Sequence, residues 1–399
     1  MRGEDLSISR RLRSRHPSAA AGDHAHDAAG FRAALPGDGR RDLRSGVARL
    51  DGLLHAAGVA HASSGSISRG RQRASGPGRA DGGDLGSSRC EESDGGPCFD
   101  AAVAPSGYRW WYIDALSDDG QYGLTVIAFI GSVFSPYYAW SGWADPFNHC
   151  AVNVALYGPR GARWAMTERG RKSLKRTRDV LLIGPSSLEW RDDALTIRLN
   201  EIAAPLPKPI RGAIVVRPLA INAKQFTLET KGNHIWRPIA PVARVSLDLD
   251  APDLRWEGHG YFDTNAGDEP LEKAFAFWTW SRANIGGDAA ILYDAERRRE
   301  APLSLAMRFS ASGEMETLDP PPLAPLPSTK WRVQRRTRAD DGVAQALRSF
   351  EDAPFYSRSL IAATFRGETV RWVNESLSLD RFANPLVRLM LPFRMPRRA

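Results

Sequence analysis

Alternating apolar and polar positions begin near residue 97 and continue almost to the end of the chain. The runs are short, rich in β-branched and aromatic residues, and separated by Gly, Pro, Asp and Asn, so they predict strands joined by turns. Clear examples are residues 108–117 (YRWWYIDALS), 122–132 (YGLTVIAFIGS), 150–158 (CAVNVALYG) and the hairpin at 359–379. Helical periodicity is scarce until the C-terminal tail. Many short strands with frequent turn signals predict an all-β fold of barrels or sandwiches.

The first 96 residues have a different composition. They contain a single aromatic residue, Phe31, and no lysine, but fifteen arginines and five of the eight histidines of the chain. Such a segment buries too little apolar surface to offset the conformational entropy that it would lose on folding. The irregular spacing of its histidines does not suit a metal site. We therefore predict that residues 1–96 are a disordered extension or the product of a start codon set too far upstream.

The formal net charge of +8 at pH 7 suits nucleic acid or an anionic membrane surface but requires neither. The sequence contains no nucleic-acid-binding module, P-loop, G-x-S-x-G elbow, dinucleotide motif or H-E-x-x-H. We therefore expect no nucleic-acid partner, no cofactor and no metal. Three cysteines are too few for a disulfide framework and fit a reducing, cytoplasmic compartment. No run of about 18 apolar residues is present that would cross a membrane as a helix.

We expect two β-domains followed by a separate tail. The first is predicted at residues 97–252 and the second at 253–379, because the GHGYFD strand is interpreted as the beginning of a new domain. The tail, 380–399, mixes Phe, Leu and Met with five arginines and has no acid after Asp380, as a membrane-surface anchor would. The alternative is a terminal segment that packs on a barrel, because prolines interrupt any helix in it.

Two short motifs place an acid–base group beside aromatic rings: His234 with Trp236, and Asp263 with Tyr261. On a strand, the i, i+2 spacing puts each pair on one face. A carboxyl group in an apolar pocket keeps its proton at neutral pH, because burial disfavours the charged form. Such an acid can protonate an isolated carbon–carbon double bond, aromatic faces can stabilise the carbocation, and a water held by a histidine can complete hydration. The alternative is that His234 is a satisfied core histidine and Asp263 begins a turn.

Longer stretches resemble a known family. WWYIDALSDDGQYGLTVIAFIGSVFSPYYAW, DPFNHCAVNVALYG, MTERG and GHGYFDTNAGDEPLE are similar to signatures of the carotenoid 1,2-hydratase (hydroxyneurosporene synthase) family. The resemblance covers residues 97–399 and leaves 1–96 outside. It implies two lipocalin-like β-barrel or sandwich domains, no cofactor, and addition of water across the terminal 1,2 double bond of an acyclic carotene such as neurosporene or lycopene. It further implies peripheral association with the inner, photosynthetic membrane.

The resemblance also implies the site residues, because the His-x-Trp and Tyr-x-Asp of the family match His234, Trp236, Tyr261 and Asp263. We assign Asp263 as the proton donor and Trp236 and Tyr261 as aromatic groups that face the cation. His234 is expected to orient the water or the aspartate. Asp114 is a candidate supporting acid. The residues expected to line the channel for the polyene are Trp110, Trp111, Tyr137, Tyr138 and Trp140.

Two other functions fit the same pattern. A non-catalytic lipocalin-like carrier of an apolar ligand would use the same aromatic residues, although an acid in its pocket would have no task. A glycosidase would pair Asp263 with Glu269 or Glu272, a chemistry that lipocalin-like barrels rarely host. A hydroxylated product from lycopene would separate the hydratase from the carrier. A closed apolar cavity around Asp263 would separate it from the glycosidase.

Overall fold

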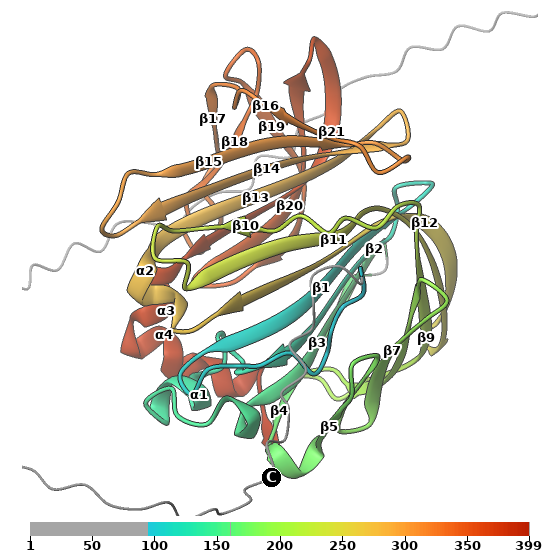
Figure 1. Ribbon diagram of the computed structural model, residues 1–399, viewed down its shortest axis with the longest axis vertical. Coiled ribbons are helices and arrows are strands. Elements are labelled where there is room, and N and C mark those ends of the chain that lie inside the picture. Colours follow the sequence, from blue (N-terminus) through green and yellow to red (C-terminus); the bar gives the residue numbers. More distant parts are fainter. Residues whose placement is uncertain (1–94, 160, 399) are drawn as a thin grey trace, which may run out of the picture. The chain divides into compact units, whose positions relative to one another are not determined.

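The computed structural model describes residues 95–159 and 161–398. Strands dominate this part of the chain and form two large sheets, which lie one above the other in Figure 1. The strands predicted at 108–117 and 122–132 are β1 (Tyr108–Ser117) and β2 (Gly123–Ile130), and they pair as a hairpin. The all-β fold class is confirmed. The prediction for residues 1–96 falls almost entirely outside the described residues.

The larger sheet, sheet A, has the strand order β22-β4-β3-β2-β1-β12-β11-β9-β8-β7-β6-β5, with β10 paired to β11. Its neighbouring strands are antiparallel, except that β22 runs parallel to β4. The bounds of its other strands are β3 (Cys150–Gly158), β4 (Gly161–Arg169), β5 (Leu174–Arg176), β6 (Val180–Ile183), β7 (Ser186–Arg191), β8 (Ala194–Ile202), β9 (Pro209–Pro218), β10 (Phe226–Thr227), β11 (His234–Ala251), β12 (Asp253–Gly267) and β22 (Arg397–Arg398).

Sheet A curls around a core of its own. Trp111, Val126 and Val152, from β1, β2 and β3, share one buried cluster with Leu181 of β6 and Ile214 of β9. Strands from the two halves of a sheet can share a core in this way when the sheet bends back on itself, as it does in a barrel. Because successive side chains of a strand point to opposite faces, the alternate residues of β1, β11 and β12 face out of this core and toward the second sheet.

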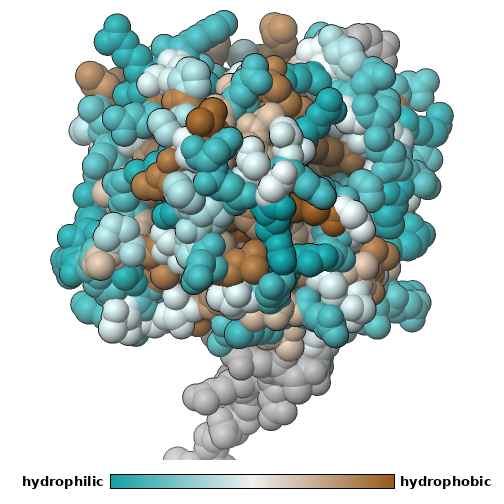
Figure 2. Space-filling model, turned by 90° about the horizontal axis from the view of Figure 1, so that it is seen from above, coloured by the Kyte–Doolittle hydropathy of each residue, from teal (hydrophilic) through white to brown (hydrophobic). Residues whose placement is uncertain are grey.

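The second sheet, sheet B, has the strand order β16-β15-β14-β13-β21-β20-β19, and a separate hairpin of β17 and β18 covers its outer face. The view of Figure 2, from above in Figure 1, shows hydrophobic residues lying singly or in small groups among hydrophilic ones. The bounds are β13 (Phe275–Ile285), β14 (Asp288–Arg297), β15 (Leu303–Phe309), β16 (Met315–Leu318), β17 (Leu323–Leu326), β18 (Arg335–Arg338), β19 (Ala344–Asp352), β20 (Tyr356–Phe365) and β21 (Glu368–Ser378).

The chain passes from sheet A to sheet B between β12 and β13. Strands β11 and β12 form one long hairpin within sheet A, and the boundary predicted at 252/253 falls at its turn. The division into domains at 97–252 and 253–379 stays a prediction. The hairpin matters for the site, because it carries both of the motifs singled out in the sequence.

The tail folds into short helices, and its last residues pair with β4. Phe382 and Leu391 are buried, whereas Leu386, Leu389 and Phe393 are exposed, so one side packs on the protein and the other faces solvent. No helix in the described ranges is long and apolar enough to span a membrane. The helices are α1 (Pro136–Trp140), η2 (Pro146–Asn148), η3 (Arg171–Ser173), α2 (Leu271–Ala274), α3 (Leu379–Ala383), α4 (Pro385–Met390) and η4 (Leu391–Phe393).

Candidate active site

A cavity of about 310 Å³ lies between sheets A and B. Its wall is mainly aromatic and apolar, and the lining residues include Trp110, Tyr112 and Asp263 from sheet A and Trp278, Trp280 and Tyr293 from sheet B. The tail residues Met390 and Phe393 also line it and are exposed to solvent. The cavity therefore opens beside the tail and extends inward to a carboxyl group.

The alternation of β12 directs Asp263 into this cavity. Tyr261, Asp263 and Asn265 face sheet B, whereas Phe262 between them lies in the core of sheet A. On the neighbouring strand, Tyr112 stands directly opposite Asp263 in the antiparallel register. Side chains in such a pair lie about 5 Å apart at Cβ. The predicted strand and its i, i+2 spacing thus place an acid against an aromatic wall.

Three side-chain donors surround the Asp263 carboxyl group. Oδ2 accepts hydrogen bonds from the Tyr261 hydroxyl at 2.7 Å and from Trp236 Nε1 at 2.9 Å. Oδ1 accepts a longer one, of 3.3 Å, from the Asn265 side-chain amide. Trp236 and Tyr261 therefore direct their polar edges at the carboxyl group. Their rings are buried among other aromatic rings, Trp236 beside Phe226 and Tyr261 beside Trp280.

Burial raises the pKa of Asp263 to about 7. The hydrogen bonds from Tyr261 and Trp236 act the other way, because they stabilise the carboxylate, and the charge of Glu375 adds to the increase. Asp263 forms no ion pair with an arginine or lysine among the described residues. A large fraction of the protein therefore carries a neutral carboxylic acid at this position at neutral pH.

His234 lies apart from this group. It stands opposite Gly267, four residues along β12 from Asp263, or about 13 Å at ~3.3 Å per residue. Its Nδ1 is 3.0 Å from the Tyr108 hydroxyl, and burial lowers its pKa, so the ring is neutral at neutral pH. Gly267 lies between the two rings, and a Cβ there would come within 2.6 Å of His234 Nδ1. The structure therefore brings together three of the four predicted residues, since Trp236 and Tyr261 bind the Asp263 carboxyl group and His234 does not. Of the four, Asp263 alone lines the cavity, so Trp236 and Tyr261 contact the acid instead of facing the space where a cation would form.

Asp114 belongs to a buried ion-pair network instead of the cavity wall. Its Oδ2 accepts hydrogen bonds from Arg282 Nε at 2.7 Å and Nη2 at 2.6 Å, and its Oδ1 pairs with Arg358. Arg358 also contacts Glu375 and the Tyr112 hydroxyl, which itself donates to Glu375 at 2.8 Å. The network links β1 of sheet A to β13, β20 and β21 of sheet B and holds the two walls of the cavity together.

Of the five residues predicted to line a channel, Trp110 alone lines this cavity of the described structure. Trp111 is its neighbour in sequence and therefore points the other way. It is fully buried in the core of sheet A, where its Nε1 donates to the Pro97 carbonyl at 2.8 Å. Strand alternation accounts for the difference between these two tryptophans.

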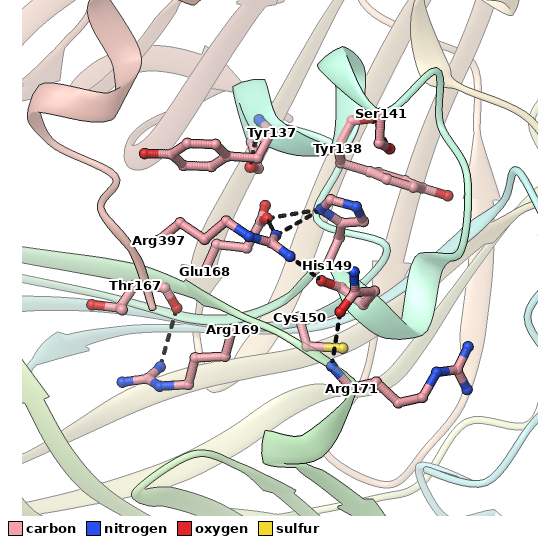
Figure 3. Close-up of polar contacts among 12 residues, drawn as sticks. Tyr137, Tyr138, Ser141, His149, Cys150, Thr167, Glu168, Arg169, Arg171 and Arg397 are labelled. Atoms are coloured by element: carbon pink, nitrogen blue, oxygen red, sulfur yellow. Dashed lines mark hydrogen bonds and ion pairs between the residues drawn. The ribbon is translucent and has the colours of Figure 1, made fainter. Parts of the chain in front are cut away.

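The other three lie on or beside α1, away from the cavity. Tyr138 donates to the Gly107 carbonyl and packs against His149, and Trp140 is 52% exposed. Figure 3 shows Tyr137 and Tyr138 beside a cluster in which Glu168 pairs with His149 and Arg397. This cluster fastens the C-terminal strand β22 to β4. Tyr137 and Tyr138 of α1 therefore pack around the end of the tail and do not line the cavity.

Sequence reasoning missed most of the cavity wall. Tyr112, Trp278, Trp280, Tyr293 and Glu375 all line it and were not singled out. The spacing of Trp110 with Tyr112, and of Trp278 with Trp280, carries the same i, i+2 signal that identified Tyr261 and Asp263. That sheet B faces sheet A could not be deduced from spacing.

Neither Glu269 nor Glu272 lines the cavity with Asp263. Glu269 lies 3.9 Å from His234 Nε2, and Glu272 pairs with Arg388 at 2.6 Å. Within residues 95–159 and 161–398, no three His, Cys, Asp or Glu residues are grouped so that they could hold a metal ion. Neither pairing expected for a glycosidase is therefore present, and the other carboxyl groups that line the cavity with Asp263 are Glu351, Asp352 and Glu375.

Comparison with known proteins identifies the family. Residues 126–399 match the family described as carotenoid hydratase CrtC. The acyclic carotenoid 1,2-hydratase of Thiocapsa roseopersicina is 54% identical over 386 residues, which cover 96% of this chain and 95% of that protein. That of Cereibacter sphaeroides is 46% identical over 68% of this chain and 98% of its own length. The chain belongs to the carotenoid hydratase family.

The match to the Thiocapsa protein also includes part of the N-terminal segment. With 96% of 399 residues covered by the Thiocapsa match, about 16 residues are left outside it, so most of residues 1–96 lie within it. The similarity thus reaches into the segment that the resemblance in the sequence left outside.

Among solved structures, kievitone hydratase from Nectria haematococca is 11% identical, with a TM-score of 0.44 over 69% of this chain and 90% of its own.

Proposed function

We propose that the protein hydrates the terminal 1,2 double bond of an acyclic carotene. The observation that carries this proposal is a carboxyl group with a pKa near 7 at the wall of an aromatic cavity. An isolated alkene needs a proton donor and a place where a carbocation survives. The cavity offers both, since electron-rich rings stabilise a cation by about 0.5–2 kcal/mol each when water is excluded. No cofactor is expected to take part.

In the proposed mechanism Asp263 donates its proton to C2 of the alkene. Because Oδ2 already accepts from Tyr261 and Trp236, the proton is assigned to Oδ1. The tertiary cation at C1 then lies among the rings that line the cavity, and water adds to give the 1-hydroxy product. Trp236 and Tyr261 position the acid by their hydrogen bonds. His234 lies apart from the acid, and its contact with Tyr108 joins the start of β11 to the start of β1 across Gly267 at the end of β12.

The direct test is incubation of the purified protein with dispersed lycopene. The expected result is a product heavier by one water, with label from H₂¹⁸O in its hydroxyl group. The non-catalytic carrier predicts binding of lycopene without any such product. Product formation that depends on an added metal or organic cofactor would contradict the cofactor-free part of the proposal.

The rate of hydration should fall as the pH rises through about 7. The pKa of Asp263 is raised to about 7, so the carboxyl is protonated and able to donate below that pH and is ionised above it. A profile of kcat/KM should therefore be flat on the acid side and decrease about tenfold per pH unit on the alkaline side. A rate that increased with pH through 7 would mean that the ionised form of Asp263 is the active one.

We further propose that the exposed side of the tail docks the protein on an anionic membrane, where an apolar carotene would dissolve. Leu386, Leu389 and Phe393 are each about 70% exposed, and Phe393 also lines the cavity. Arg381, Arg388 and Arg394 lie in the same segment but also bind within the protein, Arg388 to Glu272 and Arg394 to Glu351, so the exposed apolar side chains carry this proposal. Apolar side chains interleaved with cations are typical of interfacial binding, and here they lie where the cavity opens.

Replacing Leu386, Leu389 and Phe393 together by serine should weaken binding to anionic vesicles about tenfold or more, without loss of the fold. The measurement is co-sedimentation with vesicles that contain phosphatidylglycerol, at low and high salt. The control is a variant in which Leu206 and Leu219 are changed to serine. These two residues are exposed but lie outside the tail, so the control should bind vesicles like the wild type. Equal binding by the tail variant and the control would contradict docking through the tail.

A further inference from the structure

Glu375 is a second carboxyl group in the wall of the cavity, on the sheet opposite Asp263. It lies in β21, and its side chain is 12% exposed. Its Oε1 accepts hydrogen bonds from the Tyr112 hydroxyl and from Arg358 Nη1. No described residue donates a hydrogen bond to Oε2. One carboxylate oxygen is thus fixed by the protein, and the other is left for a group within the cavity.

Tyr112 connects the surroundings of the two carboxyl groups. It is the cross-strand neighbour of Asp263 on sheet A, and its hydroxyl donates to Glu375 on sheet B. The charge of Glu375 raises the pKa of Asp263, and Glu351 is another carboxyl group of the same cavity. Glu375 is therefore the cavity carboxylate that Tyr112 connects to the acid, and its cross-strand neighbour Trp280 packs against both Tyr112 and Tyr261.

We propose that Glu375 holds the attacking water and accepts its proton in the hydration reaction, an inference that rests on the proposed function. The O–H bond of Asp263 breaks as the alkene takes the proton at C2, and the π electrons form the new C–H bond. A lone pair of the water forms the C–O bond at C1, and the proton that this oxygen loses goes to Glu375. The proton then returns from Glu375 to Asp263 through solvent, so that the sum is alkene plus water giving alcohol.

The pairing with Arg358 suits this task. Water that has attacked a carbocation is a strong acid, so even a carboxylate stabilised by a guanidinium accepts its proton readily. Arg358 is fully buried and contacts Asp114 as well as Glu375, so the Glu375 carboxyl group is held in place at the wall of the cavity. The negative charge also favours the cation in a medium of low dielectric constant. His234, which the sequence suggested for this role, does not line the cavity.

The test separates protonation of the alkene from capture by water. In D₂O, Asp263 delivers deuterium to C2, and loss of a proton from the cation returns labelled alkene. Glu375→Gln should lower hydration of lycopene by about 100-fold or more, while deuterium uptake into recovered lycopene falls less than tenfold. Hydration within tenfold of the wild type would overturn the proposal, as would a parallel loss of hydration and deuterium uptake.

Two further variants complete the experiment. Glu296→Gln makes the same change at a sheet B carboxyl group that also pairs with an arginine, Arg336, but lies outside the cavity, and it should leave hydration within about threefold of the wild type. Glu375→Asp keeps a carboxyl group beside Arg358 but moves it back by one methylene. This variant tests the role of Glu375 if the glutamine variant does not fold. In it, hydration should fall about tenfold with deuterium uptake retained, and unchanged hydration would overturn the proposal. Absence of both reactions in the wild type would instead contradict the proposed function.

Discussion

Replacement of Asp263 by asparagine is expected to abolish hydration while the fold and carotene binding remain. The asparagine Oδ1 can accept the hydrogen bonds of Tyr261 and Trp236 that Oδ2 accepts in the wild type. It cannot supply a proton acidic enough for an alkene. Loss of a general acid lowers rates by about 10²–10⁴-fold, and we expect the upper end because water alone is too weak an acid. The measurements are lycopene turnover, lycopene binding and thermal unfolding.

Asp352→Asn is the matched control, since Asp352 also lines the cavity and receives a hydrogen bond from the Lys330 amide. It should keep most of its activity. Trp236→Phe should be intermediate, because it removes one of the two donors to Oδ2 and leaves the acid in place. Turnover by the Asp263 variant above about a tenth of the wild type would mean that another group donates the proton.

The sequence sufficed to predict the strands and the placement of Tyr261 and Asp263 on one face, because both depend on local pattern, while the role of Asp263 as the acid stays a prediction. Period-2 alternation predicted the strand that holds Tyr261 and Asp263, and it placed both on one face, as observed. The hairpin at 359–379 was likewise predicted from turn chemistry, and β20 and β21 meet at Arg366 and Gly367, both with positive φ. Such features require no knowledge of distant contacts.

The wall of the cavity could not be predicted in the same way. Trp278, Trp280 and Tyr293 meet Trp110 and Tyr112 only because sheet B packs on the outward face of sheet A. That packing joins residues about 170 positions apart, and no local period encodes it. For the same reason Asp114 looked like a possible acid from the sequence alone. Its partners, Arg282 and Arg358, come from the other sheet.

Asp114 and Asp263 show how the surroundings assign opposite tasks to two buried carboxyl groups. Both face sheet B, and Asp114 stands opposite Tyr261 in the register of β1 and β12. Asp114 is paired with two guanidinium groups, which favour its ionised form. Asp263 has only neutral donors, and burial raises its pKa. One carboxylate therefore fastens the sheets together, and the other carboxyl group is the one that we propose as the proton donor.

Asp114→Asn is accordingly expected to destabilise the fold by about 3–5 kcal/mol, the usual cost of leaving a buried charge without its partner. Arg282 is buried, and its contacts with the Asp114 carboxylate are 2.6 and 2.7 Å long. Burial already lowers the pKa of Arg282 to about 10. The measurement is equilibrium unfolding in urea, followed by tryptophan fluorescence.

Asp118→Asn is the control, because Asp118 binds Arg244 through two hydrogen bonds of 2.8 and 2.7 Å at the end of the same strand. Its side chain is 50% exposed, and solvent limits an exposed pair to at most about 1 kcal/mol. Adding Arg282→Met to Asp114→Asn should recover part of the lost stability, because the double change removes the unpaired charge. Equal unfolding free energies for the Asp114 and Asp118 variants would mean that the buried network does not hold the two sheets together.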